Sequence, residues 1–164
     1  MTLSYLPDSL VDRALDAELR TLLNFCFGSA FADKRYCYEM PEHRWLVRDD
    51  YELVAHLAVH DKVFYHNGKP VPFLGIAEVC VAPSHRGRGL VGAMLRAAEA
   101  QLNTVPFAIL LGNPEVYSSS GYHVVENVYL PSRDAEKPNP DAMIKALSSG
   151  AWPTGKVVIE GPPF

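Results

Sequence analysis

The segment Arg86–Gly89 alternates arginine with glycine and lies between two apolar stretches. Apolar, β-prone residues precede it up to Val81, and from Leu90 onward apolar residues recur at helical spacing. We therefore expect a strand, a tight turn and the first turn of a helix. Glycine lets the backbone turn sharply and approach a ligand, and free N–H groups at a helix start attract anions. Guanidinium groups bind phosphate oxygens well, so the segment predicts a phosphate-binding turn.

The phosphate could belong to a dinucleotide, because Gly87, Gly89 and Gly92 form the pattern G-x-G-x-x-G. That fingerprint also requires an acidic residue about 20 residues further on, at the end of a strand. The next apolar run, Phe107–Leu111, leads into Gly-Asn-Pro instead. A dinucleotide-binding enzyme is therefore the less favoured alternative.

The same stretch resembles motif A of the GNAT superfamily of acyl-CoA-dependent N-acetyltransferases. In that motif a strand ending V-x-P is followed by R/Q-x-x-G-x-G/A, which opens a helix. Val81-Ala-Pro and Arg86–Val91 match it, except that Val91 stands where glycine or alanine is usual. The resemblance implies acetyl-CoA as the cosubstrate, with its pyrophosphate at the turn and its pantetheine arm along the preceding strand. The coenzyme-binding residues that we expect are Val79, Cys80, Val81, Arg86, Gly87, Arg88, Gly89, Leu90, Val91 and Asn113.

A second segment, Tyr117–Tyr122, is similar to motif B of the same superfamily, Y-x-x-x-G-F, with Tyr122 in place of the usual phenylalanine. We expect a short helix there, which Gly121 ends. The resemblance makes Tyr117 the general acid, which protonates the departing CoA thiolate or holds it by a hydrogen bond. A tyrosine in a short helix is usually a packing residue. Two motifs in this order, with a strand between them, favour the catalytic role.

Acetyl transfer to an amine also needs a base, because an alkylamine with a pKa of about 10 arrives charged at neutral pH. Glu78 is the best candidate, since it precedes Val81 on the central strand, where many GNAT members carry Asp or Glu. Strand alternation predicts its side chain on the face of Cys80, opposite Val79. A solvated acid at the end of the strand is an equally weighted interpretation. His56, which interrupts an apolar strand, is the second candidate base.

The other reactive side chains are given structural roles. Cys80 is interpreted as a small buried hydrophobe rather than an acyl-accepting cysteine, because no histidine support is visible near it. His60, His66 and His85 are expected on the surface or in turns, and no metal-ligand spacing is found. From the resemblance, backbone N–H groups around residues 79–81 would form an oxyanion hole.

The expected fold is mixed α/β, an antiparallel meander joined to a βαβ unit. Pro7-Asp8-Ser9 predicts the start of a first helix, with Asp8 or Ser9 as its cap, and Gly28 ends it. The predicted strands and later helices follow in the order 44–48, 52–64, 71–81, helix from 90, 105–111, helix from 112, and 157–159. The resemblance implies the GNAT fold, with a splayed central strand, as one domain over residues 1–164.

Composition limits the function further. A net charge of −4 argues against a general nucleic-acid binder and permits a cationic substrate. Three cysteines without paired spacing indicate neither a disulfide framework nor a zinc site. The first residues lack the pattern of a signal peptide and no apolar run has the length of a membrane span, so we expect a cytoplasmic protein.

The last residues, Trp152–Phe164, are similar to a tail in GNAT relatives of the aminoglycoside N-acetyltransferase type. Trp152 or the terminal carboxylate would line the acceptor site, or the tail would only complete the sheet. The loop 31–43 would shape the acceptor pocket, or it would be only a packed connecting loop. The predicted function is direct acetyl transfer, in a ternary complex, to a primary amine of a small, aminoglycoside-like molecule. The alternative is a module that binds acyl-CoA without turnover. Homodimers are common in the family.

Overall fold

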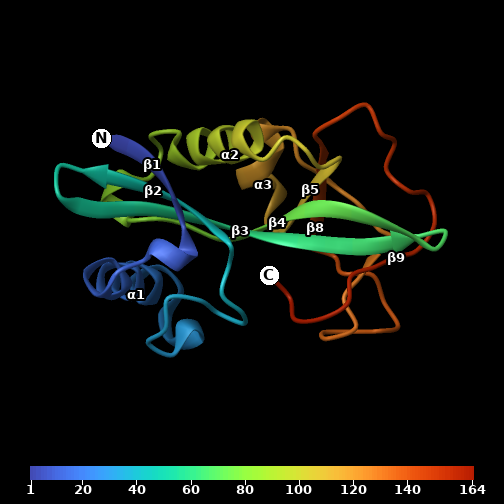
Figure 1. The fold of residues 1–164 in the computed structure, drawn as a ribbon, viewed down its shortest axis with the longest axis horizontal. Helices are drawn as coiled ribbons and strands as arrows, with labels where there is room; N and C mark the ends of the chain where they lie inside the picture. Colours follow the sequence, from blue (N-terminus) through green and yellow to red (C-terminus); the bar gives the residue numbers. More distant parts are fainter.

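A seven-stranded sheet runs along the whole molecule in the computed structural model, which describes residues 1–164 (Figure 1). The strand order is β1-β2-β3-β4-β5-β8-β6. The strands are β1 (Thr2–Pro7), β2 (His43–Asp49), β3 (Glu52–His66), β4 (Lys69–Val81), β5 (Phe107–Leu111), β6 (His123–Val124) and β8 (Ala142–Ala146). Neighbouring strands are antiparallel except β4 and β5, which are parallel. The predicted mixed α/β fold, a meander joined to a βαβ unit, is confirmed.

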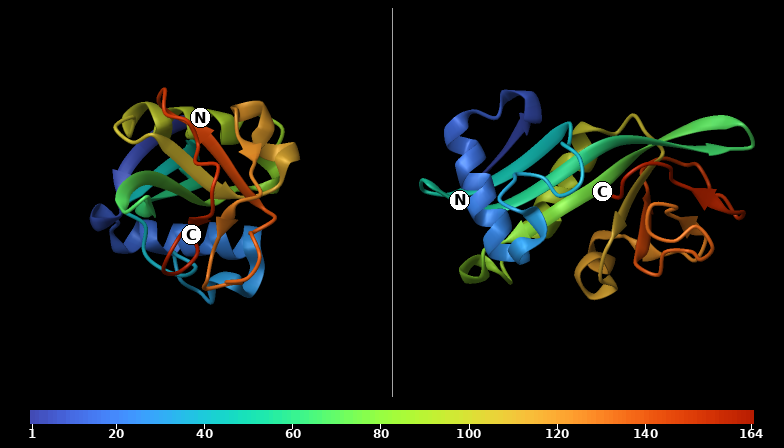
Figure 2. Two further views of the ribbon diagram at one scale, coloured as in Figure 1. Left: turned by 90° about the vertical axis from the view of Figure 1, so that its right-hand side faces the viewer. Right: turned by 90° about the horizontal axis from the view of Figure 1, so that it is seen from below.

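Two helices cover opposite faces of this sheet, α1 (Arg13–Phe27) below it in Figure 1 and α2 (Leu90–Gln101) above it. Figure 2 shows the same layers from the side. Each helix buries one apolar stripe against the strands, as amphipathic helices do. The buried residues are Leu19, Leu22 and Leu23 of α1 and Met94, Leu95 and Ala98 of α2. A short helix, α3 (Pro114–Tyr117), follows β5 on the α2 side. No helix is long and apolar enough to cross a membrane.

The start of the chain differs from the sequence prediction. Asp8 does not cap a helix, because its carboxylate is ion-paired with Arg35 and Arg44. A strand, β1, and a 3-10 turn come first, and α1 begins later with Asp12 as its cap. The Asp12 side chain accepts a hydrogen bond from the Leu15 N–H at 2.8 Å. Gly28 ends α1 as predicted.

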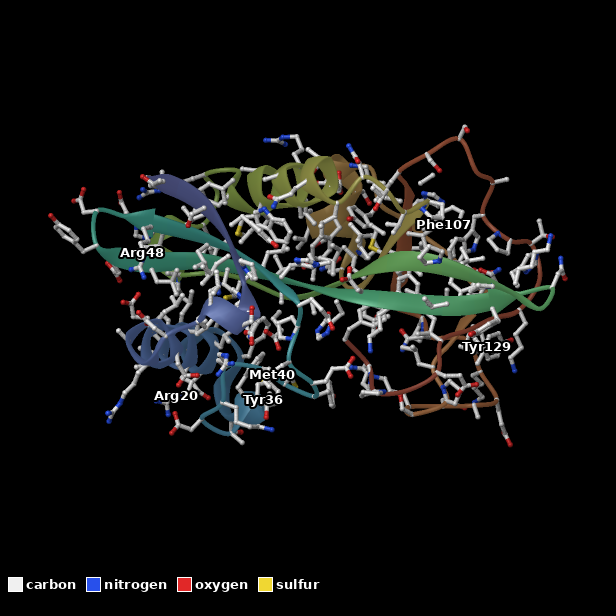
Figure 3. The ribbon with its side chains drawn as sticks, viewed as in Figure 1. Arg20, Tyr36, Met40, Arg48, Phe107 and Tyr129 are labelled. Carbon is white, nitrogen blue, oxygen red and sulfur yellow. The ribbon has the colours of Figure 1, made fainter.

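The tail forms its own structure beside the sheet. Its strand β9 (Val157–Val158) pairs with β7 (Val128–Tyr129) in a separate two-stranded sheet, so the prediction that the tail completes the main sheet is wrong. Trp152 packs edge-on against Phe107, labelled in Figure 3, with ring centroids 5.0 Å apart. Its indole N–H donates to the Asn127 side chain at 2.9 Å. Trp152 is therefore partly buried against a second hydrophobic core, which includes Phe64, Phe73 and Phe107.

Two irregularities in β4 create the site. Its ladder with β5 ends at Ile76 and Leu110, so the last residues of β4 diverge from β5. Its ladder with β3 shifts register between His56 and Ala58, and there Glu78 has a φ of +53°. A non-glycine residue in the left-handed region is uncommon and costs energy, so the surrounding structure must hold it. The bulge also interrupts the alternation on which we predicted the direction of the Glu78 side chain.

Candidate active site

A cavity of about 500 Å³ opens where β4 and β5 diverge. We call it the glycine-turn cavity. It is lined by residues from the end of α1, from β4, from the turn before α2, and from α3. They are Cys26, Phe27, Val79, Cys80, Val81, His85, Arg86, Gly87, Gly89, Leu90, Val91, Val116 and Tyr117. Nine of the ten predicted coenzyme-binding residues lie in this cavity or in its turn.

The turn itself has the geometry of an anion site. Gly87 and Gly89 both have φ of +73°, and the space beside each is open. Gly89 is the N-cap residue of α2, so no side chain satisfies the first N–H groups of the helix. No acidic residue lies in the first turn of α2 either. An uncapped helix start with open backbone beside it suits a phosphate group.

The two arginines of the turn differ in direction. The Arg86 Nε donates to the Val81 carbonyl at 3.2 Å, so this side chain folds back toward β4. The Arg88 Nη2 donates to the Ser84 carbonyl at 3.1 Å on the exposed side of the turn. Both charges stay close to the turn, yet only Arg86 lines the cavity.

Tyr117 lies on the α3 side of the glycine-turn cavity. Burial, and then the nearby Cys80, raise the pKa of its phenol to about 12, so it keeps its proton at neutral pH. Its ring packs directly on Gly112, where a Cβ atom would lie 2.4 Å from the ring carbon Cε2. Sequence reasoning overlooked this role of Gly112, because a glycine after a strand also suits an ordinary turn.

Asn113 is placed differently from the other predicted coenzyme-binding residues. Its side-chain oxygen accepts the Glu115 N–H at 2.9 Å, which caps α3. It lines a separate pocket with Arg133 and Asp141, outside the glycine-turn cavity.

A second cavity, of about 230 Å³, lies beside the bulge of β4, and we call it the Glu78 cavity. Phe27 borders both cavities. The loop between α1 and β2, in which Tyr36 and Met40 are labelled in Figure 3, supplies part of the wall of the Glu78 cavity. The lining residues are Phe27, Ala30, Phe31, Cys37, Tyr38, Glu39, His60, Ala77, Glu78, Arg133, Pro163 and Phe164.

The Glu78 side chain is only 5% exposed. One oxygen accepts the Cys37 N–H at 2.9 Å, and the other lies 3.4 Å from the Arg44 Nη1. Burial raises the pKa of this carboxyl to about 7, although the Arg44 charge and the Cys37 hydrogen bond act in the opposite direction. A carboxyl with this pKa exchanges protons near neutral pH, which is what a general base requires.

Arg44 holds this region together and is fully buried. Its Nε donates to the Asp8 carboxylate at 2.6 Å, and its Nη2 donates to the Arg35 carbonyl at 3.0 Å. Arg35 contacts the same Asp8 at 2.9 Å. Burial raises the pKa of Asp8, but the two guanidinium groups outweigh burial and hold it below its ordinary value. Arg44 and Asp8 carry no local sequence signal, since an arginine at the start of a strand is usually exposed.

His56 is the second candidate base, and both of its ring nitrogens are engaged. The Nε2 atom lies 2.8 Å from the Arg44 Nη1, which can only donate, so Nε2 accepts. The Nδ1–H therefore donates to the Glu78 carbonyl at 3.0 Å. Burial, and then Arg44, hold the pKa of His56 well below its ordinary value. A neutral, enclosed imidazole with no free lone pair orients its neighbours and is unsuited to accept a substrate proton.

Two other histidines are less exposed than we predicted. His60 is 3% exposed on β3, and burial lowers its pKa to about 4. Its side chain faces the Glu78 cavity, so its placement on the surface was wrong. His85 lies in a turn as expected, but it is buried and its Nε2 is 3.0 Å from the Asp49 carboxylate.

Comparison with known proteins identifies the family. Residues 16–125 match the family model of the acetyltransferase (GNAT) domain, which is more than half of the chain. The chain belongs to the GNAT acetyltransferase family. The predicted membership of the GNAT superfamily is thereby confirmed, and the protein is an acyltransferase.

Several solved structures share the fold of this GNAT protein at low sequence identity. The GNAT family N-acetyltransferase YhbS from Escherichia coli, in complex with CoA, superposes with a TM-score of 0.69 at 17% identity, over 96% of this chain and 88% of that one. A GNAT family acetyltransferase from Brucella melitensis, in complex with acetyl-CoA, gives 0.65 at 18% identity, over 95% and 94%. An acyl-CoA N-acyltransferase from Pseudomonas aeruginosa gives 0.61 at 20% identity, over 88% and 99%. No curated protein sequence matches the chain.

Proposed function

We propose that this GNAT protein transfers the acetyl group of acetyl-CoA directly to a primary amine of a small molecule, in a ternary complex. Glu78 is the general base and Tyr117 the general acid. The observation that carries the proposal is the position of these two side chains, in two cavities bordered by the same Phe27. One carboxyl titrates near neutral pH and one phenol stays protonated, so each has the protonation state its role requires.

The glycine-turn cavity suits the acetyl donor. Open backbone at Gly87 and Gly89 and the uncapped start of α2 can receive the pyrophosphate. The residues of β4 beyond its ladder with β5, Ala77–Val81, pair with no strand on that side, which leaves room for the pantetheine amides. E. coli YhbS and the Brucella melitensis protein, crystallised with CoA and acetyl-CoA, support acetyl-CoA as the donor.

The chemical steps follow from the two side chains. Glu78 accepts a proton from the ammonium form of the substrate, directly or through a water, and leaves a nucleophilic amine. The amine attacks the acetyl carbon, and backbone N–H groups near Val79–Val81 stabilise the oxyanion. Tyr117 then donates a proton or a hydrogen bond to the CoA sulfur as it leaves. The bond from the acetyl carbon to the CoA sulfur breaks. The acylated nitrogen releases its extra proton, which restores the Tyr117 phenol or goes to solvent, and the proton taken by Glu78 returns to solvent.

The Glu78 cavity favours an acceptor that is small at its reacting end. Its volume of about 230 Å³ and its aromatic wall of Phe27, Phe31, Tyr38 and Phe164 fit an amine on a compact apolar body. An aminoglycoside could insert one amine-bearing ring, with its other amines left outside.

Three thiols, none disulfide-bonded, agree with a cytoplasmic location.

The test is release of free CoA thiol from acetyl-CoA in the presence of a panel of amines, preceded by thermal unfolding with acetyl-CoA, CoA and NAD. A ligand at 100 times its dissociation constant adds about 2.7 kcal/mol of stability. Stabilisation by acetyl-CoA and CoA, with amine-dependent thiol release, supports the proposal. Stabilisation without release for any amine would favour a binding module, and a response to NAD alone would favour the dinucleotide alternative.

A further inference from the structure

His60 is a buried histidine whose ring nitrogens find no partner in the protein. It lies on β3 and is 3% exposed, and neither nitrogen makes a hydrogen bond. The fully enclosed polar side-chain atoms without a partner belong to Glu18 and Arg20, so the nitrogens of His60 still reach the open space of the Glu78 cavity, which the residue lines. A polar group in such a place costs energy unless water or a ligand bonds to it. The position of His60 therefore points to a ligand in this cavity.

The groups around the imidazole decide which of its nitrogens can accept a hydrogen bond. The Nδ1 atom lies 3.8 Å from the Glu39 Oε1 and 4.0 Å from the Glu42 Oε2, beyond hydrogen-bond distance of both. Glu39 is ion-paired with Lys62, and Glu42 accepts the Asp61 N–H at 3.0 Å. Burial lowers the pKa of His60 to about 4, although the Glu39 charge acts in the opposite direction, so the ring is neutral at pH 7. The carboxylates beside Nδ1 favour the ring proton there, which leaves the lone pair on Nε2.

The pairing of β3 with β4 brings this imidazole close to Glu78. Strand alternation puts Ala58 and His60 on one face of β3. Ala58 pairs with Ala77, which directly precedes Glu78, and His60 pairs with Gly75. Ala77, Glu78 and His60 all line the Glu78 cavity. The strand residues between the imidazole and the carboxyl thus carry only methyl groups, and a ligand that lies over them can reach both hydrogen-bond acceptors.

We propose that His60 is a substrate-binding residue, whose Nε2 accepts a hydrogen bond from the ammonium group of the acceptor while Glu78 accepts another. The inference rests on the proposed function, which places the acceptor amine in this cavity. A primary ammonium group has three N–H bonds and can engage both residues at once. The neutral imidazole is too weak a base to take the proton, which passes to Glu78. The N–H bond that stays on His60 then orients the nitrogen lone pair toward the acetyl carbon.

The test compares three substitutions of His60 in steady-state thiol release with 2-phenylethylamine, spermidine and 2-deoxystreptamine as acceptors. His60→Leu removes both nitrogens, and we expect the KM for the amine to rise about tenfold while the KM for acetyl-CoA stays unchanged. His60→Gln puts an amide near the place of Nε2 and should restore most of the lost affinity. His60→Asn reaches only the place of Nδ1 and should behave as His60→Leu does. His66→Gln, on the same strand but outside both cavities, is the control and should have the wild-type KM.

Thermal unfolding without ligand distinguishes substrate binding from a structural role. His60 makes no hydrogen bond within the protein, so His60→Leu should leave the Tm unchanged or raise it. A lowered Tm in His60→Leu, together with equal KM values for the amine in His60→Gln and His60→Asn, would assign His60 to the fold and overturn the inference.

Thermal unfolding of the CoA-bound protein with the same three amines separates this inference from the proposed function. Acetylation of an amine with the same KM in wild type and all three His60 variants would overturn the inference and leave the proposed function intact. An amine that raises the Tm of CoA-bound wild type but not of His60→Leu, without release of thiol from acetyl-CoA, would support binding at His60 and overturn acetyl transfer. If no amine raises the Tm and none releases thiol, both proposals are overturned.

Discussion

The two cavities that meet beside β4 are built in different ways. The glycine-turn cavity consists largely of one continuous segment, Val79–Val91, and the groups that we propose to bind the coenzyme are backbone N–H groups of its turn. The Glu78 cavity takes its wall from α1, the following loop, two strands and the end of the chain. Behind it lies a buried charge network of Asp8, Arg44 and Glu78. Substitutions should therefore have local, moderate effects in the first region and large effects in the second.

Glu78→Gln should have the largest effect, because it removes the proposed base and leaves an amide of the same shape. We expect kcat/KM to fall by about 10²–10⁴-fold. The rise of kcat/KM through pH 7, which reflects the pKa of Glu78, should disappear. Steady-state rates between pH 5.5 and 9 test this. Glu52→Gln, which changes an exposed glutamate at the start of β3, is the control. An equal loss of kcat/KM in Glu52→Gln, or a rise of kcat/KM through pH 7 that persists in Glu78→Gln, would contradict the role of Glu78 as the base.

The same substitution should change the pH dependence of stability. The Glu78 pKa rises from its ordinary 4.5 to about 7 on folding, so the folded state binds the proton more tightly. The contribution of Glu78 to the free energy of unfolding is about 3 kcal/mol. It is fully present below pH 4.5 and is lost as pH rises through 7. Urea unfolding of the wild type should show this decline in the free energy of unfolding, added to the pH dependence that other titrating groups contribute. The decline should be smaller by that amount in Glu78→Gln.

Arg44→Met tests the buried network itself. Removal of one partner leaves the Asp8 and Glu78 carboxyls without their shared cation, and we expect a loss of about 3–5 kcal/mol in the free energy of unfolding. Arg48, labelled in Figure 3 on the same strand, is a matched control because its ion pair with Glu18 is partly exposed. Arg48→Met should cost about 0–1 kcal/mol. An equal loss of unfolding free energy in the two variants would show that the buried network stabilises the protein no more than an exposed ion pair does.

Tyr117→Phe should have a smaller effect on the glycine-turn side. The ring still packs on Gly112, and only the hydroxyl that we propose to serve the leaving sulfur is lost. A thiol has a pKa near 8.5, so its thiolate leaves without full protonation, and we expect kcat to fall by about 10²-fold at most. Single-turnover rates with saturating amine measure it. An unchanged rate would remove Tyr117 from the chemistry.

Gly89→Ala should have the smallest effect. The φ of +73° disfavours alanine, but the space beside Gly89 is open, so only the turn is strained. We expect stability to fall by about 1 kcal/mol and the KM for acetyl-CoA to rise about fivefold. Gly155→Ala, where the space is also open and φ is unexceptional, is the control and should be neutral. A larger effect than that of Glu78→Gln would reverse the ranking of the two regions.

The same contrast explains what could be predicted from the sequence. The turn before α2, the central strand and the position of Tyr117 depend on neighbours in the chain, and motif spacing describes them. The ion pair of Asp8 with Arg44 joins positions far apart, and nothing local marks either residue as buried. The left-handed φ of Glu78 follows from a register shift between strands, which alternation cannot reveal. Cys26 and Cys80 likewise line the same cavity only after α1 packs on the sheet.

The divergence of β4 from β5 has a consequence for the protein without its ligand. The backbone of the last β4 residues then forms an open edge in the interior of a sheet, and such edges pair readily with other strands. We expect the ligand-free protein to be prone to aggregate during expression and storage. The acetyl donor should act as a pharmacological chaperone, because it fills that edge in the folded state alone.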